Sequence, residues 1–250
     1  MPEIKLVLTD LDGTAVYPEA HEVSDEVMSV IHEGEDKGVK FCAVTGRPFW
    51  MAKDLLAVMG FQDPCIFDGG ASIANPATGE VLWSKFLPAE TTRAAVEKLL
   101  PYAFLIEYDK GALTPDKVDL ATITDPALSV WASVPASEGE RLVDELRTLP
   151  EVAVHGNPHP GGDTSKWGVQ VTHIEADKEH AVRQLLDMMN IDKAHTIAVG
   201  DGNNDLPLFN GAAIKVAMGN GTDLLKSAAD HVVGTVQEDG FAQAIRKFVL

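Results

Sequence analysis

Two aspartates follow an apolar run in "LVLTDLDGTAVY", at positions 6 to 17. Asp10 and Asp12 are two residues apart, so in an extended chain their side chains point to the same side. Aspartate is a poor strand residue and neighbouring carboxylates repel each other, so this arrangement costs free energy. A cation held between them would offset that cost. One carboxylate could then attack a substrate while the other transfers a proton.

Three further polar clusters end apolar runs in the same way. They are Thr45-Gly46-Arg47, Asp68-Gly69-Gly70 and Gly200-Asp201-Gly202-Asn203-Asn204-Asp205. If the runs are parallel strands, these loops meet Asp10 and Asp12 at the sheet edge where open α/β sheets bind ligands. Asp10, Asp12 and Asp201 offer only oxygen ligands, which favours Mg²⁺ over zinc.

A phosphate ester suits such a site, because Mg²⁺ retains several waters and takes phosphate oxygens as its remaining ligands. The Thr45 hydroxyl and backbone N–H groups of the glycine-containing turns could hold the phosphoryl oxygens. Lys178, at a predicted helix start, could add positive charge. Taken singly, these features have ordinary alternatives: a turn or calcium loop for either acidic cluster, and a solvated helix residue for Lys178. Their combination, each at an element boundary, favours the phosphate site.

Both ends of the chain alternate apolar strands with capped helices. The predicted strands are residues 4–9, 40–45, 65–68, 196–199, 214–218 and 232–233, and the predicted helices are 24–37, 48–59, 178–190, 222–228 and one from about 238. This alternation is typical of a parallel sheet with helices on both faces.

The middle of the chain has a different pattern. Strand candidates at 104–108, 128–134, 152–155 and 169–172 accompany helices at 89–100 and 138–149. Several of these strands follow one another without a helix between them, which favours an antiparallel sheet with helices on one face. We therefore predict an α/β fold, with a Rossmann-like parallel sheet core of residues 1–85 and 174–250 and an inserted α+β domain of residues 86–173.

The composition narrows the classes of partner. With 38 acidic and 20 basic residues, the formal net charge is −18, which argues against binding to nucleic acid. No apolar run is long enough to span a membrane, and the first one is too short and too acidic for a signal peptide. Cys42 and Cys65 lie in apolar runs and are expected to be buried thiols. We expect a cytoplasmic protein, either a monomer or a homodimer.

The motifs resemble those of the haloacid dehalogenase superfamily of phosphohydrolases. "LTDLDGT" is similar to its first motif, "VTGRP" to the second and "VGDGNND" to the fourth, and Lys178 stands where the third-motif lysine is expected. "VAMGNG", "SAADHVV" and "EDGFAQAI" resemble the Cof-like subgroup, whose members carry a large α+β cap (type II, subclass B) between the second and third motifs. The resemblance covers the α/β core and the position and size of the insert.

The resemblance implies a role for each matching residue. Asp10 would be the nucleophile that forms a phospho-aspartyl intermediate, and Asp12 the general acid and then base. Mg²⁺ would be bound by Asp10, the backbone carbonyl of Asp12, Asp201 and Asp205. The implied phosphate-binding residues are Thr45, Gly46, Arg47, Lys178 and Asn204. Thr45 and Lys178 would also be catalytic, with Lys178 neutralising both the phosphoryl group and the nucleophile. One departure is Asp68-Gly69-Gly70, where the subgroup usually has Asn-Gly-Ala, because it adds a negative charge.

We therefore expect a Mg²⁺-dependent phosphatase of small phosphorylated metabolites, with sugar or polyol phosphates favoured. A phosphomutase of the same superfamily and a phospho-ligand sensor without turnover are the alternatives. The cap would select the leaving group, and at least part of the turn-rich stretch from Gly156 to Gly168 is expected to face the site. The candidate contacts in the cap are Glu107, Tyr108, His155, His159, Lys166 and Trp167.

Overall fold

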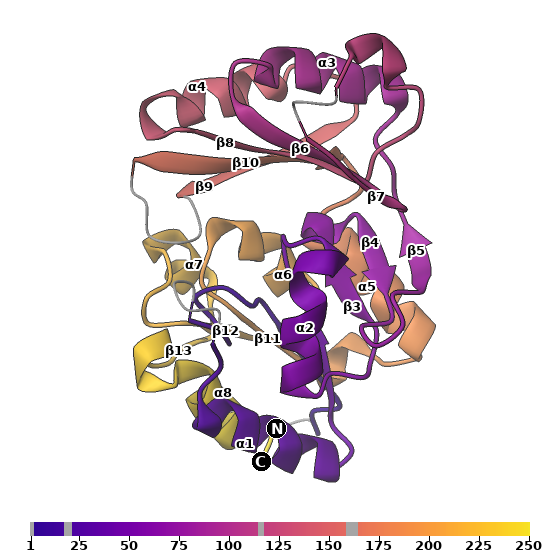
Figure 1. Cartoon of the computed structure of the whole chain (residues 1–250). Coiled ribbons are helices and arrows are strands. Elements are labelled where there is room, and N and C mark those ends of the chain that lie inside the picture. Colours follow the sequence, from indigo (N-terminus) through magenta and orange to yellow (C-terminus); the bar gives the residue numbers. More distant parts are fainter. Residues whose placement is uncertain (1–2, 18–21, 115–117, 159–164) are drawn as a thin grey trace. The chain divides into compact units, whose positions relative to one another are not determined.

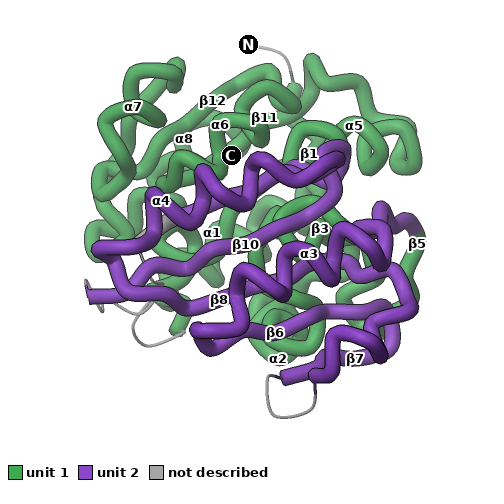
Figure 2. Tube along the Cα trace, turned by 90° about the horizontal axis from the view of Figure 1, so that it is seen from above, with its two compact units in different colours: residues 1–82, 178–250 green, residues 83–177 purple. Residues whose placement is uncertain are grey.

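The structure is a computed structural model that describes residues 3–17, 22–114, 118–158 and 165–250 (Figure 1). The chain divides into two compact units, residues 1–82 with 178–250 and residues 83–177 (Figure 2). The division expected from the sequence, after residues 85 and 173, differs from these bounds by three and four residues.

The first unit is built on a five-stranded parallel sheet. Its strands, in spatial order, are β13 (His231–Val232), β12 (Ile214–Ala217), β11 (Thr196–Gly200), β1 (Leu6–Thr9) and β2 (Lys40–Ala43). Leu6 to Thr9 of β1 lie opposite Thr196 to Val199 on one side and Lys40 to Ala43 on the other. Because the strands are parallel, their carboxyl ends share one edge of the sheet, as the α/β prediction requires.

A small second sheet lies beside β2. It consists of β3 (Cys65–Phe67), β4 (Ser72–Ala74) and β5 (Val81–Ser84), and one parallel bridge between Val44 and Ile66 connects it to the chain after β2. The sequence predicted β3 alone, because β4 and β5 are short and lack a clear alternating pattern. Cys42 and Cys65 are buried free thiols, as predicted.

Helices cover both faces of the parallel sheet. They are α1 (Asp25–Asp36), α2 (Phe49–Met59), α5 (Lys178–Met189), α6 (Leu206–Asn210), α7 (Asp223–Ala228) and α8 (Gly240–Phe248). Helices α1, α2 and α8 share one apolar cluster with alternate strand residues such as Val7 and Val199. The buried side chains of α5 and α6 lie outside that cluster, so these helices cover the other face.

The second unit has the predicted antiparallel sheet with helices on one face. The strand order is β7 (Gly111–Leu113), β6 (Ala103–Tyr108), β8 (Ser129–Pro135), β10 (Lys166–His173) and β9 (Val152–Pro158). Helices α3 (Ala89–Leu99) and α4 (Ala136–Leu146) pack on it through one apolar cluster. The ends of β9 and β10 include Gly156 and Gly168, which the sequence had assigned to a loop. No described helix has the length and apolar character needed to cross a membrane.

Candidate active site

The candidate residues come together because three strand ends are bonded to one another. The N–H of Asp10 donates to Val199 O at 3.0 Å, and the N–H of Val44 donates to Thr9 O at 2.8 Å. These bonds continue the parallel ladders one residue beyond the strands. They fix Asp10, the segment from Thr45 and the loop from Asp201 at the same edge of the sheet.

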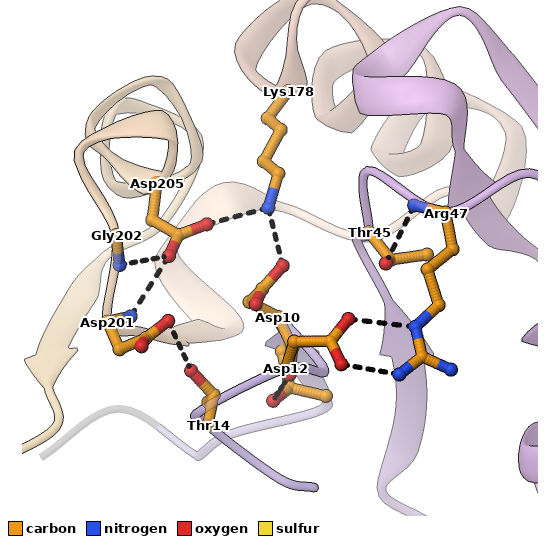
Figure 3. A network of polar contacts seen from close by, with 10 residues as sticks. Asp10, Asp12, Thr14, Thr45, Arg47, Lys178, Asp201, Gly202 and Asp205 are labelled. Atoms are coloured by element: carbon orange, nitrogen blue, oxygen red, sulfur yellow. Dashed lines mark hydrogen bonds and ion pairs between the residues drawn. The ribbon is translucent and has the colours of Figure 1, made fainter. Parts of the chain in front are cut away.

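Lys178 connects two of the carboxylates. Its Nζ donates to Asp10 Oδ1 at 2.7 Å and to Asp205 Oδ1 at 2.6 Å (Figure 3). Lys178 is only 2% exposed, so it is not a solvated helix lysine. Burial lowers the pKa of Lys178, but the charges of Asp10 and Asp205 more than compensate and raise it above its ordinary value. The two carboxylates therefore stabilise the charged ammonium form of this side chain within the site.

The loop after β11 is fixed by Asp205. Its Oδ2 accepts from the N–H groups of Asp201 and Gly202, both at 2.9 Å, while its Oδ1 accepts from Lys178. Asp201 is held from the other side, because Thr14 Oγ1 donates to its Oδ1 at 3.4 Å and Asn220 Nδ2 to its Oδ2 at 3.3 Å. Asp205 thus has three donors around it, whereas Asp201 has two weaker ones.

The backbone conformation at Gly13 explains why a glycine follows the two aspartates. Its φ is +80°, in the left-handed region, and a Cβ at this position would lie 2.3 Å from Asp201 Oδ2. Any side chain would therefore be both strained and in collision with the carboxylate. The glycine allows the chain after β1 to pass directly over Asp201.

Arg47 contacts Asp12 through two nitrogen atoms. Its Nε donates to Asp12 Oδ2 at 2.8 Å, and its Nη2 donates to Asp12 Oδ1 (Figure 3). The N–H of Arg47 donates to Thr45 Oγ1 at 3.1 Å, and its carbonyl accepts from the N–H of Asp68 at 3.0 Å. The sequence had grouped Arg47 with the phosphate-binding residues, and this pairing with Asp12 was not predicted.

The structure brings Asp10, Lys178, Asp201 and Asp205 together. It gives less information on the contacts of two other candidates, Asn204 and Gly46. Asn204 is half-buried beside Gly202, since a Cβ on Gly202 would lie 2.1 Å from Asn204 Oδ1. Gly46 lies between Thr45, which is buried, and Arg47. Their roles in phosphate binding remain predictions.

Sequence reasoning missed Asn220. Its Nδ2 also donates to Gly13 O at 2.9 Å, and its Oδ1 accepts from Val236 N–H at 2.8 Å, so its amide joins the loop after β1 to Asp201. The signal was available, because Asn220 follows strand β12 in "VAMGNG" and therefore lies at the same sheet edge as the other polar clusters.

Three carboxylates form a cluster that could hold a divalent cation. Asp10, Asp201 and Asp205 each offer an oxygen within 4.8 Å of the others. Burial, together with the neighbouring carboxylates, raises the pKa of Asp10 to about 7 and that of Asp201 to about 8. With all four acids ionised, Asp10, Asp12, Asp201 and Asp205 would carry two more negative charges than Lys178 and Arg47 neutralise. The all-oxygen donors and this surplus fit a hard divalent cation.

Residues 7–126 and 153–245 match the family model of the haloacid dehalogenase-like hydrolases. One relative is the 5-amino-6-(5-phospho-D-ribitylamino)uracil phosphatase YcsE of Bacillus subtilis, 27% identical over 99% of this chain and 97% of its own. Another is the phosphoglycolate phosphatase of Methanopyrus kandleri, 24% identical over 98% and 97% of the two chains. The structure of the HAD subclass IIB sugar phosphatase BT4131 shares the fold, with a TM-score of 0.82, 22% identity and 98% coverage of both chains.

The raised pKa of Asp201 predicts that the metal-free protein loses stability as the pH rises. The folded state keeps a proton that the unfolded carboxyl releases near its ordinary value of 3.8, so stability falls between that pH and about 8. Asp201→Asn removes the charge and should raise the melting temperature in chelator at about pH 9, by about 2 to 8 °C. The gain should shrink at about pH 5.

The matched control is Asp54→Asn, which removes one negative charge from the exposed surface of α2. Thermal melts of wild type and both variants, recorded with chelator at the two pH values, provide the comparison. Equal shifts for the two substitutions would mean that the general acidity of the protein, rather than the crowding of carboxylates at Asp201, sets its pH dependence.

Proposed function

The chain belongs to the haloacid dehalogenase-like hydrolases and is a phosphoric monoester hydrolase, and from this premise we propose that it is a Mg²⁺-dependent phosphatase of small phosphorylated metabolites. The observation that carries the proposal is that two aspartates, Asp10 and Asp12, are paired with different cationic side chains. Lys178 contacts Asp10, whereas Arg47 contacts Asp12. Two carboxylates in different electrostatic surroundings can take different chemical roles, one as nucleophile and the other as proton-transfer group.

In the proposed reaction Asp10 attacks phosphorus and forms a phospho-aspartyl bond while the ester P–O bond breaks. Asp12, which must enter this step in its protonated form, gives its proton to the oxygen of the leaving group, so that an alcohol departs. Water then attacks the phospho-aspartyl group and gives a proton to Asp12, which restores both carboxyl groups and releases phosphate. Lys178 orients Asp10 through the 2.7 Å hydrogen bond, and it offsets the charge of the Asp10 carboxylate before attack and again when the phospho-aspartyl bond breaks.

For the metal, the freest side-chain ligands are Asp10 and Asp201, with the backbone carbonyl of Asp12 as a third ligand implied by family resemblance. The carboxylate of Asp205 already accepts three hydrogen bonds, so we assign it to holding Lys178 and the loop in place. A bound Mg²⁺ would neutralise the negative charge of the phosphoryl group beside Asp10.

Thr45 has the geometry of a phosphate-binding residue in this proposal. Its Oγ1 accepts from the N–H of Arg47, and this leaves its own O–H to donate to a phosphoryl oxygen. Backbone N–H groups around Gly46 and the amide of Asn204 would add further donors. The cytoplasmic location and the state of monomer or homodimer stay predictions.

We assign substrate selection to the second unit, whose sheet has one face without helices. Strand alternation places Leu105, Trp131, Gln170 and His155 on this face, opposite to the apolar cluster formed with α3 and α4. Trp131 lies directly opposite both Leu105 and Gln170, and Gln170 lies directly opposite His155. These four residues form one row across the sheet, which we call the cap row.

The cap row suits a hydroxylated leaving group. An indole ring offers a flat apolar surface for the C–H groups of a sugar, and the neighbouring amide and imidazole can hydrogen-bond to its hydroxyls. The two relatives are named for 5-amino-6-(5-phospho-D-ribitylamino)uracil and for phosphoglycolate, which supports a small phosphorylated substrate without selecting one. We propose sugar or polyol phosphates.

Among the cap residues expected from the sequence, Trp167 and Tyr108 pack with the apolar cluster on the helix side. A Cβ on Gly139 of α4 would lie 2.4 Å from the Trp167 ring, so this ring lies against α4. Glu107, His155 and Lys166 lie on the opposite face by strand alternation. His159 lies outside the described residues.

Replacing the nucleophile tests the proposed function most directly. Asp10→Asn keeps the size of the side chain but removes the attacking charge, so kcat for 4-nitrophenyl phosphate should fall by at least about a thousandfold. Asp12→Asn should lose proton transfer and lower kcat by about 10²- to 10⁴-fold. Circular dichroism should show both variants folded. Near-normal turnover by either variant would remove the role assigned to that residue, and the absence of turnover by wild type would favour the sensor.

Metal removal tests the cofactor. Chelation should abolish hydrolysis, and added Mg²⁺ should restore it, whereas Ca²⁺ should not. Ca²⁺ is larger and tends to bind both oxygens of a carboxylate, which would draw Asp10 away from the line of attack. The measurement is initial rate against added cation, after dialysis with chelator. Full activity in chelator would exclude the metal assignment.

The cap row predicts a change in selectivity. Trp131→Ala and Gln170→Ala should raise KM for sugar phosphates by about tenfold or more while changing hydrolysis of 4-nitrophenyl phosphate little. Glu97→Ala, on the exposed side of α3, is the control. A panel of phosphate esters assayed with each variant measures the ranking. Losses of equal size for every ester would contradict the assignment.

A further inference from the structure

The ion pair between Arg47 and Asp12 has a geometry that fixes the carboxylate. Two guanidinium nitrogens, Nε and Nη2, contact the two different oxygens of Asp12. Such paired, parallel hydrogen bonds determine the plane of the carboxylate as well as its position. The side chains are 11% and 21% exposed, so the pair is only partly screened by water.

Both partners project from short backbone segments that are themselves held. The backbone of Arg47 is bonded on one side to Thr45 Oγ1 and on the other to the N–H of Asp68. The turn that contains Asp12 is closed by the bond from Gly13 N–H to Val16 O, at 2.9 Å. The two segments follow the neighbouring strands β1 and β2, so the ion pair spans a distance that the sheet fixes.

A carboxylate held in this way can still carry a proton. Each oxygen has two lone pairs, and the two hydrogen bonds from Arg47 use one on each oxygen. The second lone pair on each oxygen remains for proton transfer, in a direction set by the orientation of the carboxylate. Without the guanidinium, rotation about the last bond of the aspartate side chain would be broad.

The other cation of the site does not provide this restraint. Lys178 is bonded to Asp10 and Asp205, and neither bond involves Asp12. Among the hydrogen bonds and ion pairs resolved in the described residues, Arg47 alone contacts the carboxylate oxygens of Asp12.

We propose that Arg47 is a positioning residue that acts through Asp12: it holds the Asp12 carboxylate in the orientation that delivers a proton to the leaving group and accepts one from water. This inference rests on the proposed function. It differs from the assignment of Arg47 to phosphate binding, which the motif alone suggests, and the two assignments predict different kinetics.

The test compares phenyl phosphate with 4-nitrophenyl phosphate, which differ little in size but strongly in the basicity of the leaving group. Values of kcat/KM report the steps up to cleavage of the ester, and there a poor leaving group needs the proton of Asp12 more than a good one does. Arg47→Met should lower kcat/KM for phenyl phosphate by about 10- to 100-fold, as expected for a displaced catalytic group. The loss for 4-nitrophenyl phosphate should be several-fold smaller.

Inhibition by inorganic phosphate provides a second readout. If Arg47 acts through Asp12, the inhibition constant in Arg47→Met should stay within about threefold of wild type, because the phosphoryl contacts are intact. If Arg47 binds the phosphoryl group, inhibition should weaken and both esters should lose kcat/KM equally. The matched control is Arg183→Met, which removes an exposed arginine of α5 by the same substitution.

A double-mutant cycle decides whether Arg47 acts through Asp12 at all. Adding Arg47→Met to Asp12→Asn should change kcat/KM for phenyl phosphate by less than about threefold, since the orientation of an inactive side chain no longer matters. Multiplicative losses would overturn the proposal. Full activity of Asp12→Asn would instead overturn the proposed function, and with it this inference, which rests on the role of Asp12.

Arg47→Lys keeps the charge but cannot form two parallel bonds, so it should recover only part of the loss with phenyl phosphate. Full recovery by lysine would show that charge alone is needed, and would contradict the positioning role. If Arg47→Met does not fold by circular dichroism, Arg47→Lys carries the comparison of the two esters and the double-mutant cycle.

Discussion

The site depends on the buried ion pairs that the ammonium group of Lys178 forms with Asp10 and Asp205. They join the first residue of α5 to the end of β1 and to the loop after β11, three segments far apart in the sequence. Removing one partner from such a buried pair leaves an uncompensated charge, at a cost of about 3 to 5 kcal/mol. Since the whole domain has only about 5 to 15 kcal/mol of stability, the fold and the site constrain each other at this point.

The position of Lys178 also determines how charge is divided among the acids. The ammonium group of Lys178 donates to Asp10 and to Asp205, and neither bond involves Asp12. Asp12 is paired with Arg47 instead. Asp10 and Asp12 are neighbours in an Asp-x-Asp sequence, yet their carboxylates belong to separate hydrogen-bond networks. This separation is the physical condition for separate roles as nucleophile and proton-transfer group.

Much of this arrangement could be predicted from the sequence, and the reason is the parallel sheet. Apolar runs that end in polar residues identify strand ends, and parallel strands bring those ends to one edge, so Asp10, Asp12 and Asp201 could be grouped without coordinates. The pairing of Arg47 with Asp12 could not be predicted, because it depends on side-chain direction across two strands. The strands β4, β5 and β7 were missed because they are short. Short strands are stabilised by pairing with neighbouring strands, and a local sequence pattern does not reveal that pairing.

The acidity of the chain gives the proposed metal ion a second role, in binding the substrate. A protein with a net charge of −18 repels anionic substrates at long range, and its site must reverse that field locally. Both cationic side chains of the site are already bonded to carboxylates, and the acids outnumber them by two. The phosphoryl group would therefore meet little net positive charge from side chains alone. In the proposed reaction, a divalent cation at Asp10 and Asp201 is thus a condition for substrate binding as well as for the chemical step.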